Sequence, residues 1–206
     1  ISAAAEAVSL TQPAITQALG KLEDQLGLPL FLRRPDGMEA LESVQLIAPR
    51  FMAAEAHIAS PRVTMAQVRA LIALADAGSY PAASAMTGLS QPSLHRAIQD
   101  LTYATKRPLV ERRGRGVMLT DAGRRTVRAF RLARAELEAG LAELERLKGR
   151  ETGRIAIGAM PLSRARILPD AVTAFHTRFP DVAITIAEGS WAELVEPLRD
   201  GELDVM

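Results

Sequence analysis

Two short segments of this chain carry polar side chains at helical spacing and are near-copies of each other. From residue 10 the chain reads LTQPAITQALGKLE, and from residue 89 it reads LSQPSLHRAIQDLT. Each places a glutamine four residues before another polar side chain, Gln12 before Thr16 and Gln91 before His95. A glutamine amide can bond the N6 and N7 edge of adenine, so this spacing predicts contact with base pairs. The alternative is that these side chains only cap the helix or face solvent.

The likeness extends beyond the two segments. A shift of 79 residues superimposes residues 3–37 on residues 82–116 without a gap. In each copy we expect a short alanine-rich helix, a turn, a second helix capped by Thr11 or Ser90, and a two-stranded hairpin. This is the outline of a winged helix-turn-helix. The second copy also has an opening helix over residues 65–77, and we expect the first copy to have its equivalent upstream of Ile1.

Charge separates the two copies. Residues 11–37 are neutral overall, with Lys21, Arg33 and Arg34 against three acids, whereas residues 90–116 carry six Arg and Lys against two acids. The hairpin turns differ in the same direction, RPDG at residues 34–37 against RGRG at residues 113–116. Phosphate contacts supply much of the affinity for DNA, so the second copy is the better candidate reader. The candidate DNA contacts are Gln91, Pro92, His95, Arg96, Arg113 and Arg115, and in the first copy Gln12, Pro13, Thr16, Gln17 and Arg34.

The whole-chain charge of +1 hides the same contrast. Residues 61–150 hold sixteen Arg and Lys against eight Asp and Glu, whereas residues 1–60 hold four against seven and residues 151–206 five against nine. A basic middle segment predicts a polyanionic partner; the alternative is a solvated arginine-rich helix.

Composition excludes several other classes. The chain has no cysteine, so it cannot form disulfides or thiolate metal sites, which suits a reducing cytoplasm. It has no apolar run of membrane-spanning length. His57, His95 and His176 are the only histidines, and none lies in a nucleophile, metal or phosphate-loop motif. We therefore expect no enzyme activity, no catalytic residue, no bound metal and no cofactor.

Residues 121–148 follow one long helical pattern with a heptad-like period. Arginines crowd its first half and glutamates its second, so it is suited to pairing with an antiparallel copy of itself in a dimer or tetramer. The alternative is a helix that packs only on its own domain. The candidate dimerisation residues are Phe130, Leu137, Leu141 and Leu144.

From Gly153 the pattern alternates between strand and helix, which predicts a parallel α/β sheet. About 55 residues make a small sheet, so we expect more of this domain beyond Met206.

The motifs GSYPAASAMTGLSQPSLHRAIQDL, RRGRGVMLTDAG and GRIAIGAM make the chain similar to the LysR-type transcriptional regulators. The resemblance covers nearly the whole chain. An ordinary member has one winged helix-turn-helix, whereas this chain has two candidates. The first copy shows ALESV in place of the family's LT-AG, and the second shows LTYATK in place of LE--LG.

The resemblance implies a mainly α fold with small β wings, a long linker helix and the start of a periplasmic-binding-protein-like α/β effector domain. We expect winged helix-turn-helix domains at 1–60 and 61–120, the linker at 121–150 and the effector domain from 151 to 206. A small-molecule effector is expected near the loop after the first strand, at Pro161, Leu162 and Ser163, although Ser163 could merely cap its helix.

The sequence therefore favours a cytoplasmic, ligand-responsive regulator that binds double-stranded DNA and itself, and no membrane. One alternative is a dimerisation protein whose helix-turn-helix modules no longer bind DNA. Another is a solute-binding protein, which the basic modules argue against.

Overall fold

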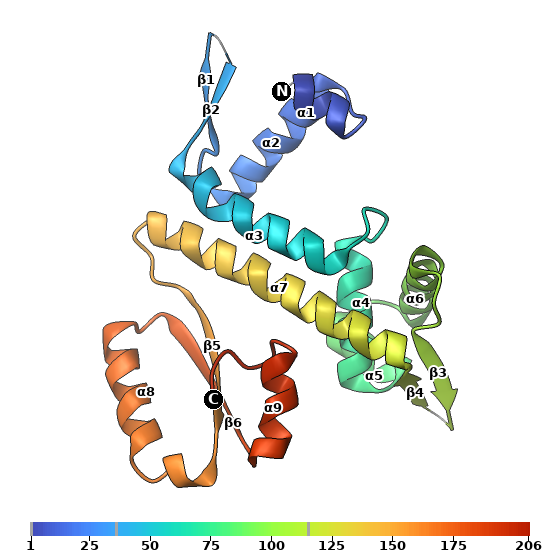
Figure 1. Cartoon of the computed structure of the whole chain (residues 1–206), viewed down its shortest axis with the longest axis vertical. Helices are drawn as coiled ribbons and strands as arrows, with labels where there is room; N and C mark the ends of the chain where they lie inside the picture. Colours follow the sequence, from blue (N-terminus) through green and yellow to red (C-terminus); the bar gives the residue numbers. More distant parts are fainter. Residues whose placement is uncertain (1, 36, 115) are drawn as a thin grey trace.

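The computed structural model describes residues 2–35, 37–114 and 116–206, and it builds the first three-quarters of the chain from two similar modules (Figure 1). The first contains α1 (Ser2–Ala7), α2 (Gln12–Leu26), β1 (Phe31–Arg34), β2 (Gly37–Ala40) and α3 (Glu42–Ile58). The second contains α4 (Met65–Ala77), α5 (Tyr80–Thr87), α6 (Gln91–Thr105), β3 (Val110–Arg113), β4 (Gly116–Leu119) and α7 (Asp121–Leu147). From α2 and α6 onward, each pair of corresponding elements begins 79 residues apart.

The local signals in the sequence place most of these boundaries. Thr11 caps α2 and Ser90 caps α6, each hydroxyl accepting a backbone N–H three residues on. Gly78 ends α4 in the left-handed conformation. Both hairpins are antiparallel, and Arg34 faces Gly37 as Arg113 faces Gly116. The expected short helix, second helix and hairpin are confirmed in both stretches.

The two modules have separate hydrophobic cores of unequal quality. In the second module α4 packs on α5, α6 and α7 around buried Leu71, Leu94, Leu101 and Phe130. The core of the first module is smaller, and Leu26 is the only buried residue of α2. Its apolar residues Ile15, Leu19 and Leu22 are half-buried. The described part of the first module has no helix equivalent to α4 to cover them.

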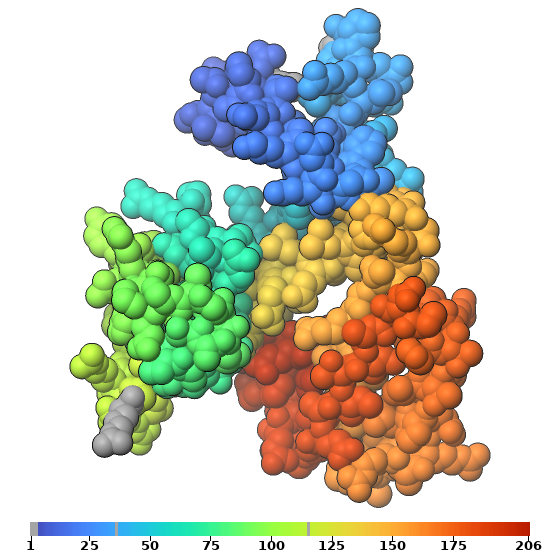
Figure 2. Space-filling model, turned by 180° about the vertical axis from the view of Figure 1, so that it is seen from behind, coloured from blue at the N-terminus to red at the C-terminus, as the bar shows by residue number. Residues whose placement is uncertain are grey.

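Helix α3 was not anticipated from the sequence, yet it makes the most extensive helix–helix contact in the described chain, with α7. The two helices run antiparallel: Ile47 and Arg50 of α3 lie against the second half of α7, around Gly140 and Leu144. Viewed from behind, the part of the first module from α1 to β2 and the part of the second from α4 to β4 form separate lobes, and α7 is visible between them (Figure 2). The α3–α7 pair is thus the structural link between the modules.

The chain then forms a small α/β unit. Strands β5 (Gly153–Ala159) and β6 (Val182–Glu188) are parallel, and Val205 adds a further parallel bridge to Ile157. A 3-10 turn, η1 (Pro161–Ser163), precedes α8 (Ile167–Arg178), and α9 (Trp191–Arg199) follows β6. This confirms the predicted parallel alternation of strands and helices. Within the described ranges, no helix has the length and apolarity needed to span a bilayer.

Ion pairs join this unit to the second module. The Arg131 guanidinium of α7 contacts the carboxylates of Asp76 at the end of α4, and of Asp200 and Glu202 just after α9. Arg128 adds a second contact to Asp200 at 3.4 Å. The Arg131 side chain is only 13% exposed. The Arg131 guanidinium is therefore partly shielded from solvent, which makes its ion pairs stronger than those between fully exposed groups.

Candidate nucleic-acid interface

Helix α6 has one apolar face that is buried and an opposite polar face that is exposed. Leu94, Ile98 and Leu101 are buried against the core of the second module. The residues on the other side are exposed, and they include four of the predicted contacts: Gln91, Pro92, His95 and Arg96. Pro92 lies in the first turn, where the missing N–H breaks no helical hydrogen bond. The structure therefore brings these four residues together at the start of one rigid helix.

The turn before α6 is held by side-chain hydrogen bonds. Gly88 ends α5 at φ 70°, and the Ser84 hydroxyl donates to the Leu89 carbonyl at 2.6 Å. Thr87 donates to the Ala83 carbonyl and accepts from the Leu89 N–H. These bonds fix the angle between α5 and α6, and thus the direction in which the start of α6 projects.

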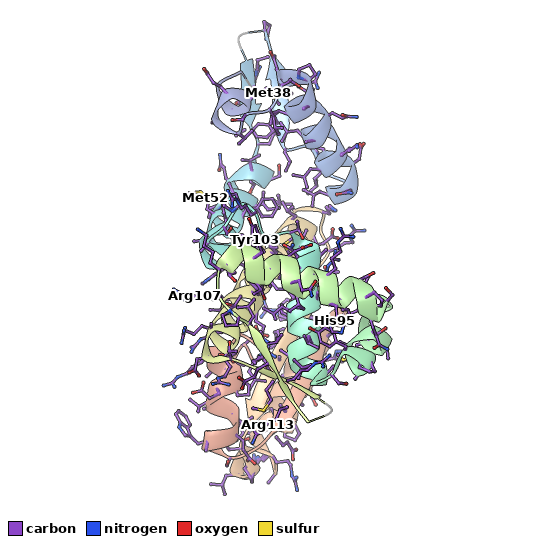
Figure 3. All side chains as sticks on the ribbon, turned by 90° about the vertical axis from the view of Figure 1, so that its right-hand side faces the viewer. Met38, Met52, His95, Tyr103, Arg107 and Arg113 are labelled. Atoms are coloured by element: carbon purple, nitrogen blue, oxygen red, sulfur yellow. The ribbon has the colours of Figure 1, made fainter. Side chains whose placement is uncertain are left out.

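His95 has a partner that the sequence analysis did not identify. Its ring stacks on Tyr80, the first residue of α5, with centroids 3.6 Å apart and planes 19° apart. Tyr80 is half-buried, and this burial raises the pKa of its hydroxyl, whereas the nearby Arg112 guanidinium opposes that shift. The phenol is neutral at physiological pH and acts here as an apolar platform. Figure 3 shows His95 on α6, with Arg113 on the hairpin beyond it.

The equivalent residues of α2 are placed differently. Gln12, Pro13 and Gln17 are exposed, but Thr16 is half-buried and its hydroxyl donates to the Gln12 backbone carbonyl at 3.0 Å. The hydroxyl of Thr16 is thus already donated within its own helix. His95, at the matching position in α6, keeps an exposed imidazole supported by a ring.

The two wings differ at one matched pair of positions. Across the β1–β2 hairpin, the Arg34 guanidinium pairs with the Glu39 carboxylate at 2.7 Å. The residue equivalent to Glu39 is Met118, and Arg113 donates to its sulfur at 3.0 Å. Among the residues that the structure describes, no carboxylate forms an ion pair with Arg113. The second wing therefore offers a cation whose charge is available to a phosphate. Arg115, a predicted contact, and Asp36 lie outside the described residues.

In the first copy, the Glu23 carboxylate has a structural role. The Glu23 carboxylate accepts the backbone N–H groups of Leu30 at 2.7 Å and Phe31 at 3.1 Å, which ties α2 to β1. The matching residue in the second copy is Thr102. Glu23 is therefore directed toward the start of the wing strand.

The residues expected at the effector site lie in η1. Leu162 is 95% exposed, and the Ser163 hydroxyl donates to the Met160 carbonyl at 2.8 Å. Helix α8 begins four residues later at Ile167, so Ser163 does not cap it. Ser163 does line a cavity of about 360 Å³ between the sheet and α8, whose other walls are almost entirely apolar. The effector role of these residues stays a prediction.

The four residues expected to dimerise are spread along α7. Phe130 is buried in the core of the second module, and Leu144 is buried in the core of the first. Leu141 is 46% exposed and Leu137 is half-buried. Pairing of α7 with another chain stays a prediction, and Leu141 is the member of this set whose side chain is most accessible for it.

In this chain two similar helix–helix–hairpin modules are thus followed by a parallel α/β unit. Comparison with known families agrees. The family model for the bacterial regulatory helix-turn-helix protein of the lysR family matches residues 1–42 and again 65–124. The model for the LysR substrate binding domain matches residues 148–206. The chain belongs to the LysR family of transcriptional regulators.

Curated relatives agree with the family models. The HTH-type transcriptional regulator GalR of Pseudomonas putida is 29% identical over 217 residues, covering 99% of this chain and 55% of the relative. A protein of Streptomyces viridosporus named as a probable hydrogen peroxide-inducible genes activator is 32% identical over 143 residues, covering 69% of this chain and 46% of its own length. The chain thus spans about half the length of these relatives. Both are named as regulators of genes, and neither is named as an enzyme.

A solved structure is also similar. Hydrogen-peroxide-bound OxyR of Corynebacterium glutamicum is 28% identical, with a TM-score of 0.45, over 70% of this chain and 45% of that one. Within the described residues, no group of three or more potential metal ligands lies together.

Proposed function

We propose that this chain is the DNA-reading part of a ligand-responsive transcriptional regulator and that its second winged module is the main reader. The observation that carries the proposal is the combination, on one rigid module, of an exposed Gln91–His95–Arg96 face with a wing arginine, Arg113, that forms no ion pair with any carboxylate in the described part of the chain. Glutamine and arginine are suited to base edges, and Arg113 to a phosphate.

The first module has the same outline but weaker chemistry. Its wing arginine is neutralised by Glu39, and α2 carries Thr16 and Gln17 where α6 carries His95 and Arg96. We therefore assign it a secondary contact, with the two modules arising from duplication of one winged unit. The appended α/β unit would receive a small-molecule effector near Ser163, and α7 would contribute to self-association through Leu141.

Paired alanine variants test which module reads DNA. Arg96→Ala with Arg113→Ala removes one base-reading and one phosphate-binding cation from the second module, and Gln12→Ala with Arg34→Ala is the matched pair in the first. We expect the second-module pair to weaken binding to duplex DNA by about tenfold to a hundredfold, since each good contact contributes about 1–3 kcal/mol. We expect less than threefold for the first-module pair, on the order of RT.

Fluorescence anisotropy over a range of salt concentrations measures both effects. Loss of the Arg113 contact should also reduce the slope of log K against log salt by about 0.9. Equal losses for the two pairs would contradict the assignment of the second module as main reader. No salt-dependent binding by the unmodified chain would contradict the DNA-binding function itself.

A further inference from the structure

The surface of α7 that carries Gly140 and Leu144 is covered by α3 of the same chain. Three kinds of contact hold the second half of α7 against α3 and the end of α2. Leu144 is buried against Ile47 and Leu26. The Arg50 guanidinium lies between Glu136 at 2.9 Å and Glu143 at 2.7 Å. The Lys148 ammonium donates to the Leu26 carbonyl at the end of α2.

The pair is fitted closely at its centre. A Cβ placed on Gly140 would lie 3.2 Å from the Cβ of Arg50, tighter than ordinary van der Waals contact. Glycine therefore permits the two helices to approach at this crossing, although it costs helix propensity. The hydrogen bonds that Arg50 donates to the Glu143 and Glu136 carboxylates also raise its pKa, so its guanidinium stays charged and paired. A glycine crossing combined with a clamped arginine indicates a specific contact.

From this contact we infer that one chain supplies two recognition helices held in a fixed relation, so that a single copy contacts two neighbouring half-sites on DNA. Phe130 in one core and Leu144 in the other are fourteen residues apart on α7, which corresponds to about 21 Å. The short connection between α3 and α4, residues 59–64, keeps both modules on the same helix pair. The half-sites would be unequal, with α6 reading one strongly and α2 the other weakly. This inference rests on the proposed DNA-binding function.

A cross-link tests whether the pairing is within one chain. The double variant Arg50→Cys with Gly140→Cys brings two sulfurs to the crossing, where the Cβ separation of 3.2 Å has to open by only a few tenths of an ångström to reach the roughly 3.5–4.5 Å of a disulfide. The native chain has no cysteine, so no other thiol competes. We expect oxidation to give an internally cross-linked chain at monomer mass on a non-reducing gel and by mass spectrometry. The single variants Arg50→Cys and Gly140→Cys are the matched controls and cannot close this bond.

The DNA measurement uses duplexes of about 40 base pairs selected by the unmodified chain from a random pool, long enough for two half-sites some helical turns apart. We expect the oxidised variant to bind with an affinity within about threefold of the reduced form, on the order of RT, and a mass measurement to give one chain for each pair of protected segments. Its hydroxyl-radical footprint should cover two segments. Gln12→Ala with Gln17→Ala should remove protection from one segment and leave the other.

Three outcomes would overturn the inference: covalent dimers in place of cross-linked monomers, no cross-link at all, or a single protected segment for the intact chain. Failure of the pool to yield any bound duplex, with the internal cross-link still formed, would instead overturn the proposed DNA-binding function.

Discussion

His95 shows how a half-buried neighbour can hold an exposed side chain in place. An exposed histidine on a helix samples several rotamers, and holding one of them at an interface has an entropic cost. The Tyr80 ring stacks on the imidazole at 3.6 Å and thus fixes its plane before any partner arrives. Tyr80 is itself held by the core of the second module. We therefore regard Tyr80 as a positioning residue for His95.

Replacing Tyr80 tests this role. Tyr80→Ala should weaken DNA binding about three- to tenfold, since an aromatic pair contributes about 0.5–1.5 kcal/mol. Tyr80→Phe keeps the ring and is the matched control, with affinity close to that of the unmodified chain. Anisotropy titrations measure the affinities, and thermal melts show whether each variant is folded.

A double-mutant cycle with His95→Ala separates positioning from general damage. If Tyr80 acts through His95, then Tyr80→Ala should add little once His95 is replaced. Fully additive losses, or an equal loss in Tyr80→Phe, would contradict the role.

At the scale of the element, the surroundings of the wing arginine can be compared between the two hairpins of the same chain. Each has an arginine next to its turn, and the arginine side chain contacts Glu39 on the neighbouring strand in one hairpin and Met118 in the other. A cross-strand carboxylate holds the cation and cancels its field at the distance of a phosphate. The difference in DNA binding that we propose for the two wings therefore depends on a residue outside the RPDG and RGRG turns.

Replacing Met118 with glutamate, the residue at the matching position of the first wing, should make the Arg113 charge less available to a phosphate. Met118→Glu places a carboxylate beside Arg113, as Glu39 lies beside Arg34, although here the new carboxylate also faces Glu111 across the hairpin. We expect DNA affinity to fall about fivefold to tenfold at low salt with a smaller salt slope. Met118→Gln has the same shape without the charge and should have little effect. Anisotropy at several salt concentrations distinguishes the two. The idea is wrong if the glutamine variant loses as much affinity as the glutamate variant.

The elements predicted best from the sequence are those with their own local signals. Thr11, Ser90 and Gly78 mark helix ends through bonds to neighbouring backbone, so α2, α6 and α4 followed from the sequence. Helix α3 did not: Leu41 at its start makes no side-chain cap, and Pro49 lies inside it. It is stabilised by packing on α7, and such tertiary packing is invisible to local propensity.

The structure also explains how the first copy accommodates ALESV in place of the family's LT-AG motif. In the second module Thr120 caps α7 and donates to the Pro108 carbonyl at 2.7 Å. In the first module the equivalent Pro29 carbonyl accepts instead from buried Ser43 at 2.6 Å. The two modules therefore use the same proline carbonyl as acceptor, but the hydroxyl that donates to it comes from a different position in the sequence. The sequence motif differs between the copies, whereas the hydrogen bond is present in both.

At the scale of the whole molecule, the question is how the α/β unit could affect the second module, which we propose as the main reader of DNA. The ion pairs of Arg131 give a direct physical contact between them, because one guanidinium joins α4 to the segment after α9. Its position on α7 places this junction on the helix that also links the two modules. The sequence showed only a run of arginines here, because the partners lie 55 to 71 residues away.

Removing this cation should uncouple the α/β unit from the second module. Arg131→Met keeps the apolar stem but loses contacts to Asp76, Asp200 and Glu202, so we expect a loss of stability of roughly 1 kcal/mol after solvent screening. Backbone amides just after α9 should exchange faster with deuterium, while those of α6 stay protected. Arg134→Met is the matched control, because Arg134 pairs only with Glu138 on the same helix among the described residues. If both variants accelerate exchange after α9 equally, then Arg131 is not the junction and the two parts are joined by apolar packing, such as that of Leu132 on Gly201.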